Sequence, residues 1–176
     1  AALRVSDAAI GVVDAVTGVE IGTERTWNFA ADYNLPRAVF FNKMDRSEAD
    51  ADRALEVAKE RFGRQVVPLQ MVVNPGEGFN QIIDLVAMKL YKYQDGKAIV
   101  GDIPTDILDN AQRLREQLVE SVAETDETLM EKYFSEGELE TDELVEGLRK
   151  AVLQLDLFPA FFGDAYNNVG VDRLLD

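Results

Sequence analysis

Four consecutive residues, Asn42-Lys43-Met44-Asp45, are the strongest candidates for chemistry in this sequence. They follow a short apolar run, Ala38–Phe41, which suits a strand buried on both faces. In open parallel sheets, ligands bind beyond the carboxyl ends of the strands, where this tetrapeptide would lie. The Asp45 carboxylate can accept hydrogen bonds from the N1–H and the N2 amino group of guanine. Adenine lacks this pair of donors, so the spacing indicates a site that selects guanine.

The other side chains of this tetrapeptide have supporting roles in the same interpretation. The Asn42 amide has both a donor and an acceptor and can tie a base to nearby loops. The stem of Lys43 is long and apolar and can lie along the base plane, with its ammonium in water. Met44 is expected to point into the domain. Two plainer interpretations remain open, because an Asn-Lys pair after a strand is an ordinary turn and Asp45 could cap the next helix.

The motif needs a sheet to hold it, and the two ends of the chain supply the pattern for one. Three short apolar runs without alternation predict strands buried on both faces of a parallel sheet: Ala8–Val13, Ala38–Phe41 and Leu157–Phe162. A helix is predicted between the first two, at Thr23–Tyr33. Strand and helix therefore alternate as in an α/β fold.

A second helix is predicted after the motif. Ser47-Glu48-Ala49-Asp50 has the spacing of a capping box, and Gly63 is a suitable end for the helix that follows. The middle of the chain has a mixed pattern. Strands are predicted at Val66–Val73 and Met88–Tyr93, around a short helix near Ile82–Val86.

The acidic residues are concentrated in one block, 104–150, which has 14 acidic and 5 basic side chains. Its apolar residues recur at helical spacing. The sequence predicts one helix with Thr105 as its N-cap, a second at Thr125–Phe134 and a third from Thr141 through Val152. Most of these charges are interpreted as solvated helix faces. The functional alternative is a surface that avoids RNA phosphates and selects a basic protein.

The composition excludes several classes of function. The chain has 176 residues, a formal net charge of −15, and neither His nor Cys. A His general base, a Cys nucleophile, a Cys/His zinc site and a disulfide framework are therefore impossible. The net charge argues against a broad basic face for nucleic acid or an anionic membrane. No signal peptide or transmembrane run is evident, and the missing initiator Met suggests a piece of something longer.

A resemblance to a known family runs along nearly the whole chain, in order. The residues that carry it are Val13–Glu20, Thr23-Glu24, Leu35-Pro36-Arg37, Phe41–Arg46, Val67–Gln70, Ile83–Val86, Leu129–Tyr133, Phe158-Pro159 and Asn168–Leu175. Together they resemble the latter half of the GTPase domain of bacterial elongation factor G or of its paralogues. Release factor 3 and the tetracycline-resistance ribosomal protection proteins share parts of the pattern.

The resemblance implies an α/β fold: a partial P-loop-type GTPase sheet of the last three parallel strands, side by side, with an inserted α+β subdomain. Residues 1–65 and 151–176 would form the sheet domain and residues 66–150 the insertion. Asn42, Lys43 and Asp45 match the guanine-specificity motif. Gly163, Asp164 and Ala165 match a second guanine loop, in which the backbone N–H of Ala165 reaches the guanine O6. GTP or GDP would be the ligand.

Two departures from the family pattern matter. Asp164 stands where the family usually has Ser, and an ionised carboxylate cannot donate the hydrogen bond that helps to hold Asp45. We expect weaker nucleotide binding or a carboxylate turned to water, unless only the backbone of this loop matters. The sequence also has no GxxxxGK[ST] loop for phosphates and Mg²⁺. This chain alone is therefore expected not to hydrolyse GTP.

The resemblance also implies partners. It points to the ribosome, with the acidic insertion contacting the ribosomal stalk protein, in the cytoplasm. No membrane association and no direct nucleic-acid binding are expected for this chain. The alternative function is an acidic interaction module with a vestigial guanine site. The apolar run Ala8–Val13 would form an open sheet edge, which predicts self-association or disorder there.

Overall fold

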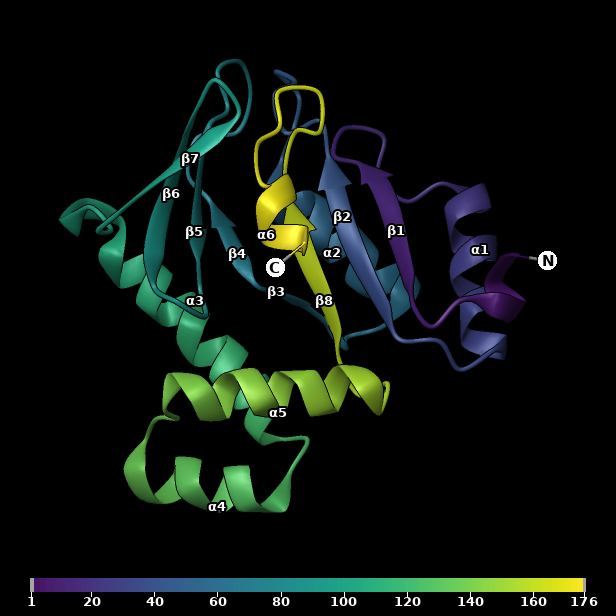
Figure 1. Ribbon diagram of the computed structural model, residues 1–176, viewed down its shortest axis with the longest axis vertical. Coiled ribbons are helices and arrows are strands. Elements are labelled where there is room, and N and C mark those ends of the chain that lie inside the picture. The colour runs from purple at the N-terminus through teal and green to yellow at the C-terminus, as the bar shows by residue number, and fades with distance from the viewer. Residues whose placement is uncertain (1, 176) are drawn as a thin grey trace.

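The computed structural model describes residues 2–175 and contains two sheets (Figure 1). A short 3₁₀ helix, Ala2–Val5, precedes the first sheet. That sheet is parallel, in the order β1 (Ala9–Asp14), β2 (Arg37–Asn42), β8 (Phe158–Phe162), β3 (Val66–Pro68). The three predicted strands are confirmed and lie side by side as expected. β3 adds a fourth strand, which pairs with β8 in the sheet although it falls in the segment assigned to the insertion.

Helices α1 (Ile21–Asp32) and α2 (Ala51–Phe62) pack against one face of this sheet. Trp27 of α1 stacks on Phe62 of α2, with ring centroids 4.2 Å apart, and meets the edge of Phe158 at 5.4 Å. Gly63 ends α2 at a φ of 111°, as predicted. The predicted capping box at Ser47 is wrong. Asp50 caps the helix instead by accepting from the Arg53 N–H, because the loop continues for three residues past Ser47.

The second sheet is antiparallel, in the order β4 (Gln70–Val72), β5 (Gln81–Asp84), β6 (Lys89–Gln94), β7 (Lys97–Gly101). The short helix predicted at Ile82–Val86 is wrong, since Ile82 and Ile83 lie in β5. Both are fully buried in different core clusters, so the strand is covered on both faces and shows no alternation. A short apolar run of this kind does not distinguish helix from strand by periodicity. Asp84 then accepts from the Val86 and Ala87 N–H groups and makes a turn.

The acidic block is helical, as predicted: α3 (Thr105–Ala123), α4 (Glu127–Glu136) and α5 (Thr141–Leu153). Two predicted helix starts differ. Pro104 occupies the N-cap of α3, which puts Thr105 inside the helix. Asp126 caps α4 by accepting from the N–H groups of Thr128 and Leu129, so α4 begins two residues after the predicted Thr125.

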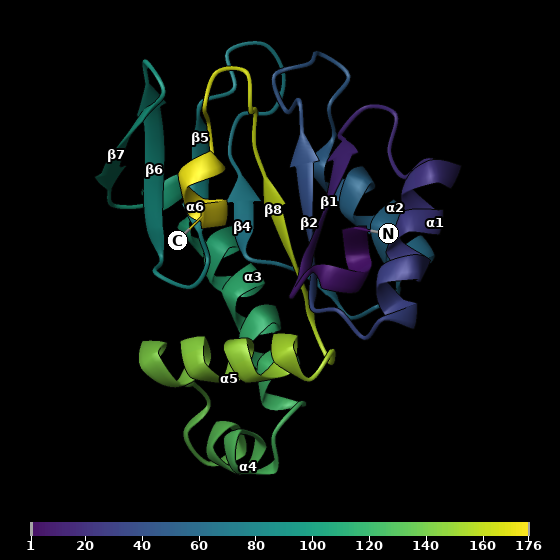
Figure 2. The ribbon, with the colours of Figure 1, turned by 45° about the vertical axis from the view of Figure 1, so that its right-hand side comes forward.

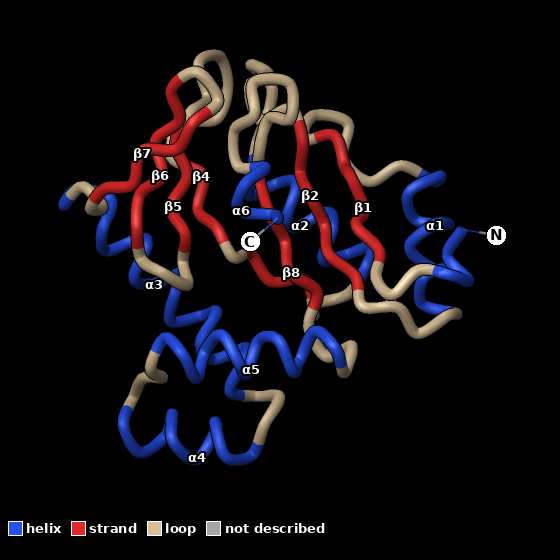
Figure 3. The backbone as a smooth tube through the Cα atoms, in the orientation of Figure 1, coloured by secondary structure: helices blue, strands red, loops and turns tan. Residues whose placement is uncertain are grey.

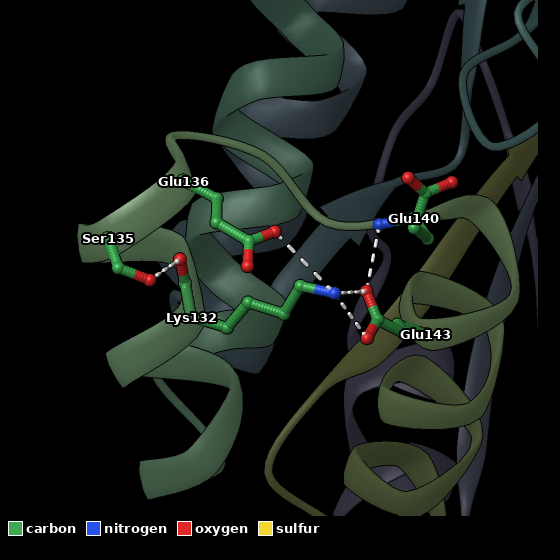
Figure 4. Close-up of polar contacts among 5 residues, drawn as sticks. All are labelled: Lys132, Ser135, Glu136, Glu140 and Glu143. Atoms are coloured by element: carbon green, nitrogen blue, oxygen red, sulfur yellow. Dashed lines mark hydrogen bonds and ion pairs between the residues drawn. The ribbon is translucent and has the colours of Figure 1, made fainter.

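Ion pairs join α4 to α5 within this block (Figure 4). Lys132 Nζ lies 2.6 and 2.8 Å from the two carboxylate oxygens of Glu143 and 3.6 Å from Glu136. Glu143 also accepts from the Glu140 N–H at the start of α5. The hydrogen bond from Lys132 is the main cause that lowers the pKa of Glu143. Part of the acidity is therefore structural, while most of the charged side chains face solvent as expected.

Figures 1 and 2 show α4 and α5 at the end of the molecule opposite the loops that follow β1, β2 and β8. Figure 3 shows these loops gathered at one edge of the parallel sheet. Helix α6 (Val171–Leu175) follows the last of them. The division into domains at 66 and 150 stays a prediction. None of the helices within residues 2–175 is long and apolar enough to cross a membrane.

Strand β1 forms one edge of the described parallel sheet. Its side chains Ile10 and Val12 are 53% and 59% exposed, which is high for large apolar residues. The open edge is present as expected, whereas its pairing with another chain stays a prediction.

Candidate functional site

The carboxyl ends of β1, β2 and β8 meet at one edge of the sheet and place the motif loop next to the second predicted loop. Met44 is fully buried, as predicted, and anchors the motif loop in the core. Its backbone N–H donates to the Gly163 carbonyl at 3.1 Å, and the Gly163 N–H donates to the Phe41 carbonyl at 2.9 Å. The two segments, about 120 residues apart in sequence, are therefore joined directly by backbone hydrogen bonds.

Asn42 ties the two loops together with its side chain. Its Oδ1 accepts from the Ala165 N–H at 2.9 Å. This N–H is the group that the resemblance assigns to a guanine O6, so in this structure Asn42 already uses it. The Asn42 Nδ2 group has no hydrogen-bond partner among residues 2–175 and remains a free donor.

Lys43 is held by a residue outside the motif, which the sequence pattern did not single out. Its Nζ lies 2.6 Å from Asp14 Oδ2, at the end of β1. The expectation of an ammonium in water is therefore wrong, although half of the Lys43 side chain stays exposed. Lys43 adopts a φ of 64°, a left-handed conformation that is uncommon outside glycine. The position of Asp14 at the end of a predicted buried strand was the available signal.

Asp14 also shapes its own loop. Its Oδ1 accepts from the N–H groups of Val16 and Thr17, at 2.9 and 3.3 Å. The hydrogen bond from Lys43 is the largest cause that lowers the pKa of Asp14, and burial opposes it. Because the pKa is lowered, this carboxylate stabilises the folded site above its ordinary pKa. That contribution is lost as the pH falls through the lower, folded value.

Asp45 lies in the turn after β2 and is partly exposed. It does not cap the following helix, because Asp50 has that role. Its carboxylate makes no hydrogen bond to another residue within the described part of the chain. Asp45 is therefore available as an acceptor beside the free donor of Asn42. Three neighbouring groups with donor and acceptor character thus surround one small region of surface.

The comparisons with known proteins agree with this arrangement. The family profile described as "Elongation factor Tu GTP binding domain" matches residues 1–176. The chain belongs to the elongation factor Tu GTP-binding domain family. This family comprises translational GTPases, which bind guanine nucleotides.

A solved structure gives the same result for the fold. A crystal structure of a protein from Thermus thermophilus is 32% identical and superposes with a TM-score of 0.89. The match covers 99% of this chain and 26% of the Thermus chain. This chain therefore spans about a quarter of the length of that protein. The α/β architecture with its additional antiparallel sheet is confirmed.

Within this GTP-binding domain family member, the unusual Asp164 is 2% exposed. Its carboxylate does not face water, so that part of the expectation is wrong. Oδ1 accepts from the Tyr166 N–H at 3.0 Å, and Oδ2 accepts from the side-chain amide of Asn167. The Asp164 backbone exchanges two 2.9 Å hydrogen bonds with Val169. The buried carboxylate is thus satisfied by its own loop, which it closes.

No three His, Cys, Asp or Glu side chains converge to hold a metal ion anywhere in residues 2–175. The described groups at the edge of the sheet are those of a base site: an amide, a carboxylate, an ammonium and backbone N–H groups. Chemically, this set can recognise a planar base through donors and acceptors and contains no nucleophile positioned beside a general base.

Proposed function

We propose that this chain supplies the base-recognition half of a GTP-binding domain in a ribosomal translocation GTPase similar to elongation factor G. The observation that carries the proposal is the joining of the two loops by the 2.9 Å contact between Asn42 and Ala165. In this proposal Asp45 accepts from N1–H and the N2 amino group of guanine. Asn42 Nδ2 donates to the base, and Ala165 N–H turns from Asn42 to the guanine O6, or is shared with it.

Lys43 lies along the base in this proposal, and Asp14 keeps its ammonium in place. A phosphate loop and Mg²⁺ ligands would come from residues outside this sequence, which has no GxxxxGK[ST] segment. Because phosphoryl transfer depends on those groups, the chain by itself binds a guanine base weakly and does not hydrolyse GTP. The complete protein would use GTP hydrolysis at the ribosome, in the cytoplasm.

Titration of the ¹⁵N-labelled chain with GDP tests this function. We expect the amide signals of Ala165 and of the Asn42 side chain to shift with a dissociation constant in the millimolar range, on the order expected for a few hydrogen bonds and one stacked base. ADP at equal concentration serves as the control, since adenine lacks the donor pair for Asp45. Equal shifts with ADP and GDP, or none with GDP, would contradict the proposal.

A second candidate function rests on the far end of the molecule. Phe134 on α4 is 80% exposed, beside a hollow of about 440 Å³ that is lined by Glu124, Asp126, Glu127, Met130 and Glu131. An apolar side chain among carboxylates suits a basic partner with an apolar anchor. We propose that this surface contacts the ribosomal stalk protein.

Binding of the isolated C-terminal domain of the stalk protein tests this contact. We expect binding to be measurable at low ionic strength and to weaken steeply by about 0.5 M salt, because the pair is held partly by opposite charges. Phe134→Ser should remove the apolar anchor and weaken binding at every salt concentration. Absence of binding at low salt would contradict the contact.

A further inference from the structure

The second sheet touches the two proposed base loops at three separate points. Gln70 of β4 is 3% exposed, and its Oε1 accepts from the Phe162 N–H at 2.8 Å, immediately before Gly163. The Gly76 N–H donates to the Met44 carbonyl at 2.8 Å. Asn168 Nδ2 donates to the Gly96 carbonyl at 2.9 Å. The first two contacts are at the bases of the loops, whereas the third is on the exposed part of the second loop.

The third contact joins two tight turns. Asp95 and Gly96 connect β6 to β7 with φ values of 50° and 70°, as a two-residue hairpin turn requires. Asn168 also has a left-handed φ, 56°. The turns are close enough that a Cβ on Gly96 would lie 3.2 Å from the Asn168 Cβ. The hairpin tip therefore packs directly on the loop.

The residues after this loop are fixed to the same hairpin. Tyr93 of β6 donates to Asp172 Oδ1 at 2.5 Å, and Arg173 Nη1 donates to the Tyr91 hydroxyl at 3.2 Å. Loop residues 165–168 are exposed and lie between β8 and these anchors. Apart from the Asn42 contact with Ala165, the Asn168 contact is the hydrogen bond that the structure shows between these exposed residues and another segment.

We propose that Asn168 is a positioning residue for the second base loop, acting through the tip of the β6–β7 hairpin. The inference rests on the proposed function, because it assigns Asn168 an effect on guanine binding. Asn168 fixes the exposed turn of the loop, and the turn fixes the direction of the Ala165 N–H three residues earlier. Hydrogen bonds weaken steeply with misalignment, so a loop that moves should bind the base less well.

Asn168→Gly tests the inference, with Asn34→Gly as the matched control. Both residues are exposed Asn with a left-handed φ, 56° and 52°, so glycine is tolerated by the backbone at each position. We expect both variants to fold with similar melting temperatures. Only Asn168→Gly should shift the Ala165 amide signal of the free chain and raise the GDP dissociation constant, by about 2- to 10-fold for one lost hydrogen bond.

The outcomes separate the inference from the function on which it rests. If GDP does not shift the Ala165 signal in the wild-type chain, the proposed function fails. If the wild-type chain binds GDP and Asn168→Gly binds it equally, or if Asn34→Gly weakens binding as much, the positioning role is overturned. Should Asn168→Gly fail to fold, Asn168→Asp replaces it. That variant keeps the size and the φ preference, but turns a carboxylate oxygen toward the Gly96 carbonyl, and the same loss of affinity is expected.

Discussion

Asp45→Asn is expected to weaken GDP binding by about 10- to 100-fold, from the loss of charge-assisted hydrogen bonds to the base. An ionised carboxylate accepts from both N1–H and the N2 amino group, whereas an amide presents one acceptor and one donor. The amide donor introduced by the substitution would face the N2 amino group and repel it. In the titration of the labelled chain, the GDP-dependent shift of Ala165 should disappear.

The same variant should gain affinity for xanthosine diphosphate, because xanthine has a carbonyl where guanine has the N2 amino group. The introduced amide can donate to that carbonyl and accept from N1–H. The gain matters because a damaged site would lose both ligands. A variant that binds GDP like the wild-type chain would exclude base recognition by Asp45.

Asp50→Asn is the matched control for this experiment. It makes the same change five residues later, at the N-cap of α2, where Asn and Asp are about equally effective. We expect it to leave GDP binding and the melting temperature close to those of the wild-type chain. A similar loss of GDP binding in both variants would point to net charge rather than to base recognition.

Gly163→Ala is expected to lower the free energy of unfolding by about 1–3 kcal/mol, because it overpacks a rigid part of the site. A Cβ on Gly163 would lie 2.5 Å from the Val169 carbonyl oxygen and 2.6 Å from a Phe40 ring carbon. The Val169 carbonyl is held in place by the Asp164 N–H, so it has little freedom to move away. For a chain of this size the melting temperature should fall by about 2–4 °C for each kcal/mol.

Gly22→Ala provides the comparison for that substitution. Gly22 lies in α1, and a Cβ there would meet no atom within 4 Å. Alanine in a helix is more favourable than glycine, so this variant should be more stable by up to about 1 kcal/mol. Urea or thermal unfolding of the two variants measures the contrast. If Gly163→Ala melts like the wild-type chain, the close approach at β8 is not rigid.

The sequence was sufficient to predict the parallel sheet and the place of the motif in it. The runs at Ala8–Val13, Ala38–Phe41 and Leu157–Phe162 have no polar alternation, because their strands are covered on both faces. The same property made β5 ambiguous, since Ile82 and Ile83 are adjacent and both fully buried. Local pattern alone could not show that β6 pairs with this segment as a strand.

Helix starts were less predictable than the helices themselves. Ser47, Thr105 and Thr125 have suitable side chains for caps, yet Asp50, Pro104 and Asp126 occupy these positions. The choice depends on where the preceding loop leaves the core, which is a property of the packed chain. Several neighbouring polar residues satisfy the same local preference.

By itself, the sequence determined which residues stand at the carboxyl ends of the strands: Asn42, Lys43, Asp45 and the segment from Gly163 to Ala165. Strand pattern and order along the chain are local properties, so they could be inferred from residue types. The tertiary structure decided the partners of these residues. Asp14 pairs with Lys43, and Asp164 turns into its own loop. Such contacts join strands and loops far apart in sequence, and their geometry exists only after the sheets have packed together.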